Sequence, residues 1–236
     1  MPAAPRSETE LIQWALALAG RTLGAVAEEV GASLPRDQRR AKGKVGELLE
    51  LALGASAGSL PEPDFQAIGV ELKTIPVDAR GCPRETTYVC TVPLLGHTGE
   101  AWEMSLVRRK LARVLWVPIE ADPDICLESR RIGTPLLWSP TAGQELVLRR
   151  DWEELMQMVS LGELDRISAR HGEYLQIRPK AASGSSLREA IGSEGERIQT
   201  LPRGFYLRSG FTRQILAQHY LQETAGHGLN WPRKST

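Results

Sequence analysis

Residues 64–73, with the sequence DFQAIGVELK, carry side chains that together could perform metal-dependent chemistry. Asp64 is followed seven positions later by Glu71, and Lys73 comes two positions after Glu71. Carboxylates are the hard oxygen ligands that Mg²⁺ prefers, and a neighbouring ammonium group can orient a nucleophilic water or offset charge that develops on a phosphate. Chance matches to the pattern D-x6-E-x-K are common, so the pattern alone indicates only a generic metal-dependent nuclease.

The alternation of apolar residues in the same stretch predicts the strand that would hold this site. Ile68, Val70 and Leu72 occupy every second position, as in a strand with one buried face. Glu71 and Lys73 then share the opposite face, where their side chains start roughly 7 Å apart. The first carboxylate of the pattern would lie at the start of the strand.

A helix predicted over residues 45–53 offers a third carboxylate. Its apolar residues fall at helical spacing, and Glu50 lies on the shoulder of the apolar stripe. An exposed helix residue is the ordinary explanation of this glutamate. The alternative is that Glu50 joins Asp64 and Glu71 at one site.

Hydrophobic periodicity predicts a mixed α/β fold for the whole chain. The expected helices span residues 8–19, 22–30, 45–53, 101–113, 148–159 and 211–221. The expected strands span residues 64–73, 86–92, 114–119, 136–138, 174–177 and 205–207. Turn-forming residues between the first two strands indicate an antiparallel hairpin.

Composition narrows the class of protein. The chain of 236 residues has 29 basic and 29 acidic side chains, so its net charge does not indicate nucleic acid, although three local basic clusters do. The first cluster, residues 36–44, has a net charge of +4 from five cations, Lys42 among them, and one acid. A solvated helix face is the ordinary explanation of each cluster. The longest apolar stretch, residues 48–57, is too short to span a membrane, and the three cysteines indicate reduced thiols in a cytosol.

Long segments of the chain resemble the MutH family of strand-discriminating DNA mismatch repair endonucleases. The similarity covers roughly residues 8–222 and is carried by residues 43–78, RETTYVCTVPL, VRRKLARVLWVPIE, TPLLWSP, RISARHGEYLQIRPKAA and LPRGFYL. This family belongs to the PD-(D/E)xK nuclease superfamily. The resemblance implies a restriction-endonuclease-like mixed α/β fold, in which two lobes form a DNA-binding cleft.

The resemblance also implies roles for residues that match the family's motifs. Catalysis would fall to Glu50, Asp64, Glu71, Lys73 and Lys110. Mg²⁺, for which Mn²⁺ would substitute, would be bound by Asp64, Glu71, the carbonyl oxygen of Leu72 and, at least indirectly, Glu50. DNA would be contacted by Lys42, Tyr88, Arg178, Pro179, Lys180 and Tyr206. Taken alone, Lys110 has the ordinary explanation of a helix lysine whose stem lies along the protein surface.

The activity implied by the resemblance is nicking of the unmethylated strand of hemimethylated GATC sites, 5′ to the guanine. Unmethylated GATC duplexes would also be substrates, and MutL would stimulate the enzyme after MutS detects a mismatch. The protein would be a cytoplasmic monomer that acts at the nucleoid and has no membrane contact. Two features depart from the family pattern: Tyr88 stands where phenylalanine is expected, and the tail beyond Glu223 is longer than the pattern requires.

We expect a single endonuclease domain over residues 1–222, followed by a flexible tail at 223–236. A catalytic lobe would span residues 8–100 and a DNA-reading lobe residues 101–222. Two other functions stay open: a restriction-type endonuclease that cuts both strands of GATC, and a DNA-binding accessory protein without catalysis. The second is disfavoured because all candidate catalytic residues are present.

Overall fold

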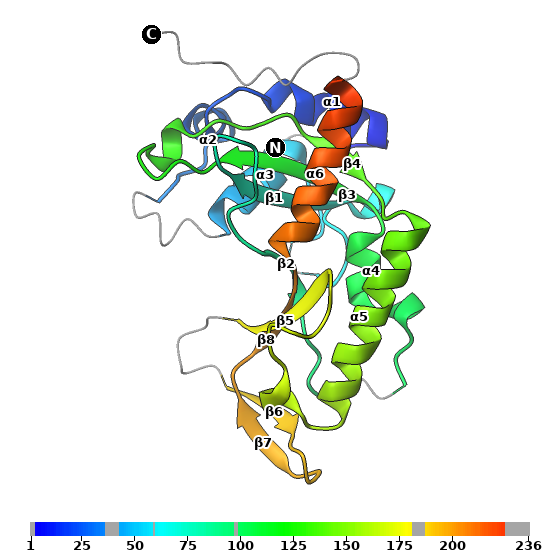
Figure 1. The fold of residues 1–236 in the computed structure, drawn as a ribbon. Coiled ribbons are helices and arrows are strands. Elements are labelled where there is room, and N and C mark those ends of the chain that lie inside the picture. Colours follow the sequence, from blue (N-terminus) through cyan, green and yellow to red (C-terminus); the bar gives the residue numbers. More distant parts are fainter. Residues whose placement is uncertain (1–2, 36–42, 59, 97–98, 181–186, 225–236) are drawn as a thin grey trace. The chain divides into compact units, whose positions relative to one another are not determined.

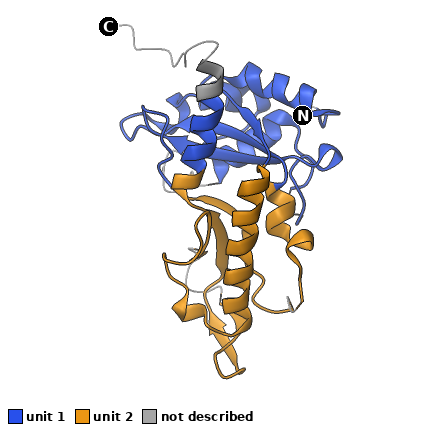
Figure 2. Cartoon of the chain, turned by 45° about the vertical axis from the view of Figure 1, so that its right-hand side comes forward, with its two compact units in different colours: residues 1–85, 112–139, 212–236 blue, residues 86–111, 140–211 orange. Residues whose placement is uncertain are grey.

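The computed structural model describes residues 3–35, 43–58, 60–96, 99–180 and 187–224, with only the backbone described at 221–224. Lys42 and most of the expected tail, residues 225–236, lie outside the described residues. The chain divides into two compact units (Figure 2). Unit 1 comprises residues 1–85, 112–139 and 212–236, and unit 2 comprises residues 86–111 and 140–211.

Both units are built from segments that lie far apart in the sequence. In unit 1, strand β1 (Glu71–Val77) pairs in parallel with β3 (Val114–Glu120), which follows it by more than thirty residues. The expected contiguous lobes, 8–100 and 101–222, therefore do not coincide with the two units. The division of catalysis and DNA reading between two lobes, and the cleft between them, stay predictions.

Unit 1 is a small sheet with helices packed against it (Figure 1). The strand order is β1-β3-β4, with β4 (Leu136–Trp138) antiparallel to β3. Helices α1 (Glu8–Leu18), α2 (Leu23–Val30) and α3 (Lys44–Leu53) bury their apolar faces in the same core as Leu72 and Leu115. Strand β3 is buried along almost its whole length, as expected of a central strand covered on both faces.

The strand predicted over residues 64–73 is wrong in its first half. Residues Gln66–Ile68 form a 3-10 helix, Gly69 has a φ of +65°, and β1 begins only at Glu71. A bridge between Phe65 and Val70 closes this loop. The apolar alternation arose because Ile68, Val70 and Leu72 pack in one core, although only Leu72 lies in a strand.

The predicted hairpin between residues 64–73 and 86–92 is also wrong. Strand β2 (Thr87–Thr91) belongs to unit 2, where it pairs antiparallel with β8 (Arg203–Leu207). Local turn chemistry favoured pairing of neighbours, but each strand has a more extensive partner elsewhere in the sequence. Pairing between strands far apart in the sequence cannot be predicted from local sequence patterns.

Unit 2 is an antiparallel sheet of order β2-β8-β5 that packs beside a long helix (Figure 1). Strand β5 spans Leu175–Pro179, and helix α5 spans Ala142–Ser160, beginning earlier than predicted at a Thr141–Gln144 capping box. The helix expected over 101–113 is instead a 3-10 turn, Trp102–Met104, and a short α4, Leu106–Leu111. Strands β6 (Arg188–Ile191) and β7 (Arg197–Thr200) form a hairpin that the sequence did not predict.

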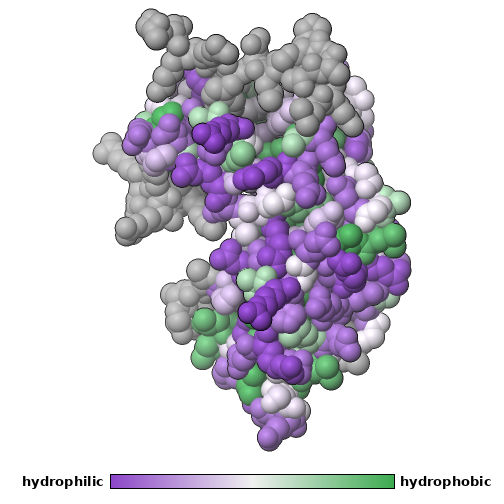
Figure 3. Space-filling model, in the orientation of Figure 1, coloured by the Kyte–Doolittle hydropathy of each residue, from purple (hydrophilic) through white to green (hydrophobic). Residues whose placement is uncertain are grey.

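Helix α6 (Ser209–Thr224) completes the mixed α/β fold, which confirms the predicted fold class. No helix among the described residues is long and apolar enough to cross a membrane. The face drawn in Figure 3 is largely hydrophilic, with apolar residues in small separate groups.

Candidate active site

Strand β1 places Glu71 and Lys73 on one face, as the sequence predicts. Glu71 is 1% exposed, and Lys73 Nζ donates to Glu71 Oε1 at 2.5 Å. Removing a carboxylate from water is costly unless the charge is paired and hydrogen-bonded. The two side chains therefore hold each other in one geometry and keep both charges available at the start of the strand.

Asp64 is fixed against the outer edge of β1. Its Oδ2 accepts from the Leu72 N–H at 2.8 Å, and the side chain is buried. The Glu71 N–H donates to the Arg113 carbonyl, toward β3, so the Leu72 N–H and carbonyl point to the opposite edge. The Leu72 carbonyl and the Asp64 carboxylate thus share one edge of β1, and both are oxygen donors.

Helix α3 brings Glu50 to the same group. The pKa of Glu50 is raised to about 7, first by burial away from water and next by the negative charge of Asp64. Lys73 lowers this pKa, while Glu71 and Glu47 raise it further. The three predicted catalytic acids and the motif lysine are therefore close enough to influence one another.

The chemistry of this donor set fits a divalent cation. Burial raises the pKa of Glu50 most, and the negative charges of Asp64 and Glu71 raise it further, so three carboxylates influence one another near one ammonium. Within the described residues, no group of three or more His, Cys, Asp or Glu side chains is placed so that these side chains alone could hold a metal ion. A metal here would need ligands beyond those side chains, which suits Mg²⁺ because Mg²⁺ usually keeps several waters.

Lys110 lies on α4 of unit 2, whereas the four side chains just described belong to unit 1. Its side chain is half-buried. Along the chain it precedes Val114, the partner of Glu71 in the β1–β3 ladder, by four residues. Its role as a second active-site lysine stays a prediction.

The sheet of unit 2 brings two predicted DNA-contacting aromatics together. Tyr88 on β2 and Tyr206 on β8 are directly opposed, with ring centroids 5.4 Å apart in an edge-to-face arrangement. Gly204, two residues before Tyr206, makes this contact possible. A Cβ at Gly204 would come within 2.9 Å of Tyr88 Cε2 and 3.0 Å of Tyr206 Cε2.

Two basic residues that were predicted to contact DNA lie against the same tyrosines. Lys180 Nζ lies 4.7 Å from the Tyr88 ring centroid and donates to the Tyr88 hydroxyl at 3.3 Å. The Arg178 guanidinium lies 5.9 Å from the Tyr206 ring centroid. Both basic side chains are exposed, so this reading face, defined by Tyr88, Arg178, Lys180 and Tyr206, presents cations and aromatic edges to solvent.

Pro179 is exposed and follows Arg178 on β5, so its side chain lies on the other side of the strand from the reading face. Gln176, which the sequence analysis missed, lies opposite Tyr206 and is 8% exposed. The signal for it was its place two residues before Arg178 on a short strand. Gly204 was also missed, because a glycine in a strand marks close packing only once its neighbours are known.

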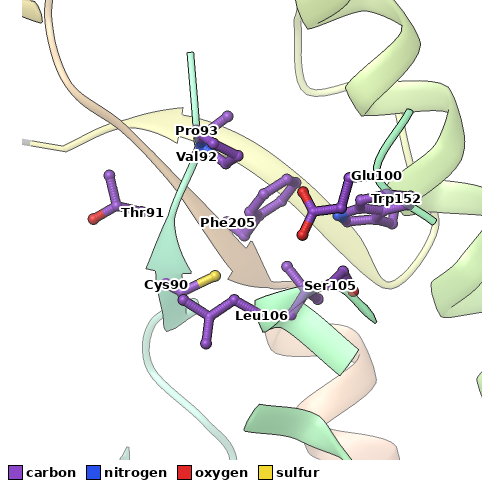
Figure 4. A pocket seen from close by; sticks show the side chains of 10 residues that line it. Cys90, Thr91, Val92, Pro93, Glu100, Ser105, Leu106, Trp152 and Phe205 are labelled. Atoms are coloured by element: carbon purple, nitrogen blue, oxygen red, sulfur yellow. The ribbon is translucent and has the colours of Figure 1, made fainter. Parts of the chain in front are cut away.

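An apolar cavity of about 270 Å³ lies within unit 2 (Figure 4). Phe205, which flanks it, is adjacent to Tyr206 along β8 and so faces the opposite side of the sheet. Trp152 and Glu100 close another part of its wall. None of the predicted site residues lines this cavity.

The raised pKa of Glu50, caused first by burial and then by neighbouring carboxylates, predicts how the metal-free protein responds to pH. Its folded-state pKa of about 7 exceeds the ordinary value of 4.5, so its contribution to the free energy of unfolding falls as pH rises between those values. In EDTA, Glu50→Gln should be more stable than wild type at pH 8 by about 1 kcal/mol, a value reduced for partial exposure, and equal to it at pH 4.5. Thermal melts at both pH values measure this, and an equal difference at both would contradict it. Glu28→Gln, at an exposed glutamate of α2, is the control.

The fit of Gly204 between the tyrosines predicts a destabilising Gly204→Ala. The added methyl must displace two rings, at a cost of about 1–3 kcal/mol in denaturant unfolding. Gly143→Ala is the matched control, because a Cβ there meets nothing within 4 Å. Equal midpoints for the two variants would show that the rings yield freely.

Comparison with known proteins identifies the family. A family model described as "DNA mismatch repair enzyme MutH" matches residues 53–151, which include Asp64, Glu71, Lys73 and Lys110. Proteins named "DNA mismatch repair protein MutH" from Escherichia coli strains 536 and K12 are 58% identical over 217 residues, covering 92% of this chain and 95% of each relative. The same protein from Klebsiella pneumoniae strain 342 is also 58% identical, over 92% of this chain and 94% of its own length. The chain therefore belongs to the MutH family of DNA mismatch repair endonucleases.

Proposed function

We propose that this endonuclease nicks the unmethylated strand of hemimethylated GATC sites, 5′ to the guanine, by Mg²⁺-dependent hydrolysis. The observation that carries the proposal is the convergence of Asp64, Glu71, Lys73 and Glu50 at the start of β1. Membership of a family of mismatch repair endonucleases supports it. Unmethylated GATC duplexes would also be cut.

In this proposal the acids of unit 1 hold the metal and Lys73 holds the water. Asp64, Glu71 and the Leu72 carbonyl would be ligands, Glu50 would act directly or through a water, and Mn²⁺ would substitute for Mg²⁺. When bound, the ion supplies a water of lowered pKa and neutralises charge on the phosphate. Lys73, held by Glu71, orients the attacking water through its N–H groups. Lys110 adds positive charge at the scissile phosphate.

The reading face of unit 2 supplies a rationale for sequence recognition. Arg178 and Lys180 are exposed cations that suit the acceptor-rich edge of guanine and the phosphate backbone. Tyr206 would sense the adenine amino group, which the A·T pair presents in the major groove, by steric fit. Tyr88, Pro179 and Lys42 would contact the DNA nearby.

We place this protein in the mismatch repair system, where it would act as a monomer. MutL would stimulate it after MutS detects a mismatch, and it would work in the cytoplasm at the nucleoid. The relatives' names support a repair role. One assay separates this function from its rivals: a hemimethylated GATC duplex with Mg²⁺, with and without MutL. Nicking of the unmethylated strand alone is expected. Breaks in both strands of unmodified DNA would indicate a restriction-type enzyme, and binding without cleavage an accessory protein.

Lys73→Ala tests the role of the motif lysine. Without the ammonium group the attacking water loses its orientation, so the nicking rate should fall by about a hundredfold or more, as for other losses of a positioned catalytic group. DNA affinity, measured by gel shift in Ca²⁺, should be unchanged. Full nicking activity with unchanged binding would contradict the proposed role of Lys73. Arg80→Ala, at an exposed cation of the same unit outside the three basic clusters, is the control.

Metal binding is tested without measuring activity. Mg²⁺ should raise the melting temperature of the wild type, because binding to the folded state alone stabilises it. Asp64→Asn should reduce this shift strongly, whereas Asp124→Asn, at an exposed acid of the same unit, should leave it intact. An equal shift in both variants would place the ion elsewhere.

A further inference from the structure

The turn before β5 is held by a buried carboxylate that has no role in the function proposed above. Asp151, on α5, is 1% exposed. Its Oδ2 accepts from three consecutive backbone N–H groups, those of Glu173, Tyr174 and Leu175, at 2.8, 2.6 and 3.0 Å. Hydrogen bonds to a charged acceptor are stronger than those between neutral groups. One oxygen therefore fixes the direction in which the chain enters the strand.

The carbonyl groups of the same turn are held by Arg208, which follows the last residue of β8. Its guanidinium donates to the carbonyls of Ala169, His171 and Gly172 at 2.7, 2.9 and 3.0 Å. Its own backbone N–H donates to the Tyr174 carbonyl at 2.9 Å. A planar guanidinium with several donors suits such a task better than an ammonium group.

Packing leaves this turn little freedom. Gly172 has a φ of +72°, and a Cβ there would lie 1.9 Å from the Leu175 carbonyl oxygen, so only glycine fits. The Tyr174 ring stacks on Phe211 with centroids 3.9 Å apart and an interplanar angle of 9°. Asp151, Arg208 and this ring pair together form a clamp on residues 169–175.

The clamp precedes β5, a strand so short that its own pairing fixes its register only weakly. Strand β5 has five residues and, within the described part of the sheet, pairs with β8 alone. Its register places Arg178 opposite Gly204, beside the tyrosines of the reading face. A slip of one residue would turn Arg178 and Lys180 to the other face. A fixed entry point three residues before Arg178 prevents this slip.

We propose that Asp151 and Arg208 are positioning residues that set the register of β5 and so aim Arg178 and Lys180 at DNA. The aim toward DNA rests on the proposed function; the control of register does not. Neither residue touches the reading face among the contacts described here, so their effect passes through the backbone of β5.

Asp151 offers a graded pair of substitutions. Asp151→Ala removes the acceptor from three N–H groups. Asp151→Asn keeps one carbonyl oxygen of similar reach but loses the charge. Because Oδ1 has no hydrogen-bond partner among the described residues and lies 3.6 Å from Arg150, an amide group can occupy its place. The asparagine variant should therefore recover part of what the alanine variant loses.

The experiment measures specificity at a temperature where all variants are folded. Nicking is followed on a duplex with one hemimethylated GATC site and on a duplex with one base pair of that site changed. For Asp151→Ala we expect the ratio of kcat/KM values to fall about tenfold, the discrimination that one base contact supplies. The fall should appear mainly in KM for the GATC duplex, and Asp151→Asn should be intermediate. Val159→Ala, at a buried position of α5, controls for destabilisation and should keep the wild-type ratio.

A second measurement reads the register without DNA. In the wild type, NMR contacts should connect Arg178 with Gly204, and the amides of residues 173–175 should exchange slowly. Both should be weakened in Asp151→Ala, or in Arg208→Lys if the alanine variant does not fold. Native register and an unchanged specificity ratio would overturn the proposal. A wild type that does not distinguish the two duplexes would overturn the proposed function instead, and the NMR result would still decide the role of the clamp.

Discussion

Unit 1 depends on how charge is buried at the start of β1. Glu71 is almost wholly removed from water, and it is tolerated there because Lys73 donates to it from the same face. Asp64 is buried because the Leu72 N–H, which β3 does not use, donates to it. Glu50 is the third carboxylate of the group, and its pKa is raised by burial and by the charge of Asp64. Three carboxylates with one ammonium leave a net negative charge, which is the basis of the cation site proposed above.

In unit 2, the sheet presents polar groups on one face and buries apolar side chains on the other. Ile177 and Phe205 turn inward, and Tyr206 and Arg178 turn outward from neighbouring positions on the same strands. Gly204 leaves the space that lets the tyrosines meet. Arg178 and Lys180 contact aromatic rings and hydroxyl groups rather than carboxylates. Among the contacts described, neither cation has an acidic partner on this face.

The tyrosine at position 88, where the family pattern led us to expect phenylalanine, has a visible consequence. Its hydroxyl lies 2.9 Å from Thr91 Oγ1 and accepts from Lys180. A phenylalanine would keep the cation–π contact with Lys180 but lose this link. The hydroxyl thus adds a second contact that restrains the Lys180 side chain just beyond the end of β5.

The sequence by itself determined the motif, the mixed α/β class, most helices and the one-faced placement of Glu71 and Lys73, because periodicity and residue chemistry are local properties. The family resemblance favoured the catalytic role of Glu50 over an exposed helix position, and it added the two tyrosines of the reading face. Only the tertiary structure decided that β1 starts at Glu71 and pairs with β3, that Tyr88 meets Tyr206 over Gly204, and that Asp151 and Arg208 grip the entry to β5. These features join residues far apart in the chain, and the contacts that select them exist only after folding.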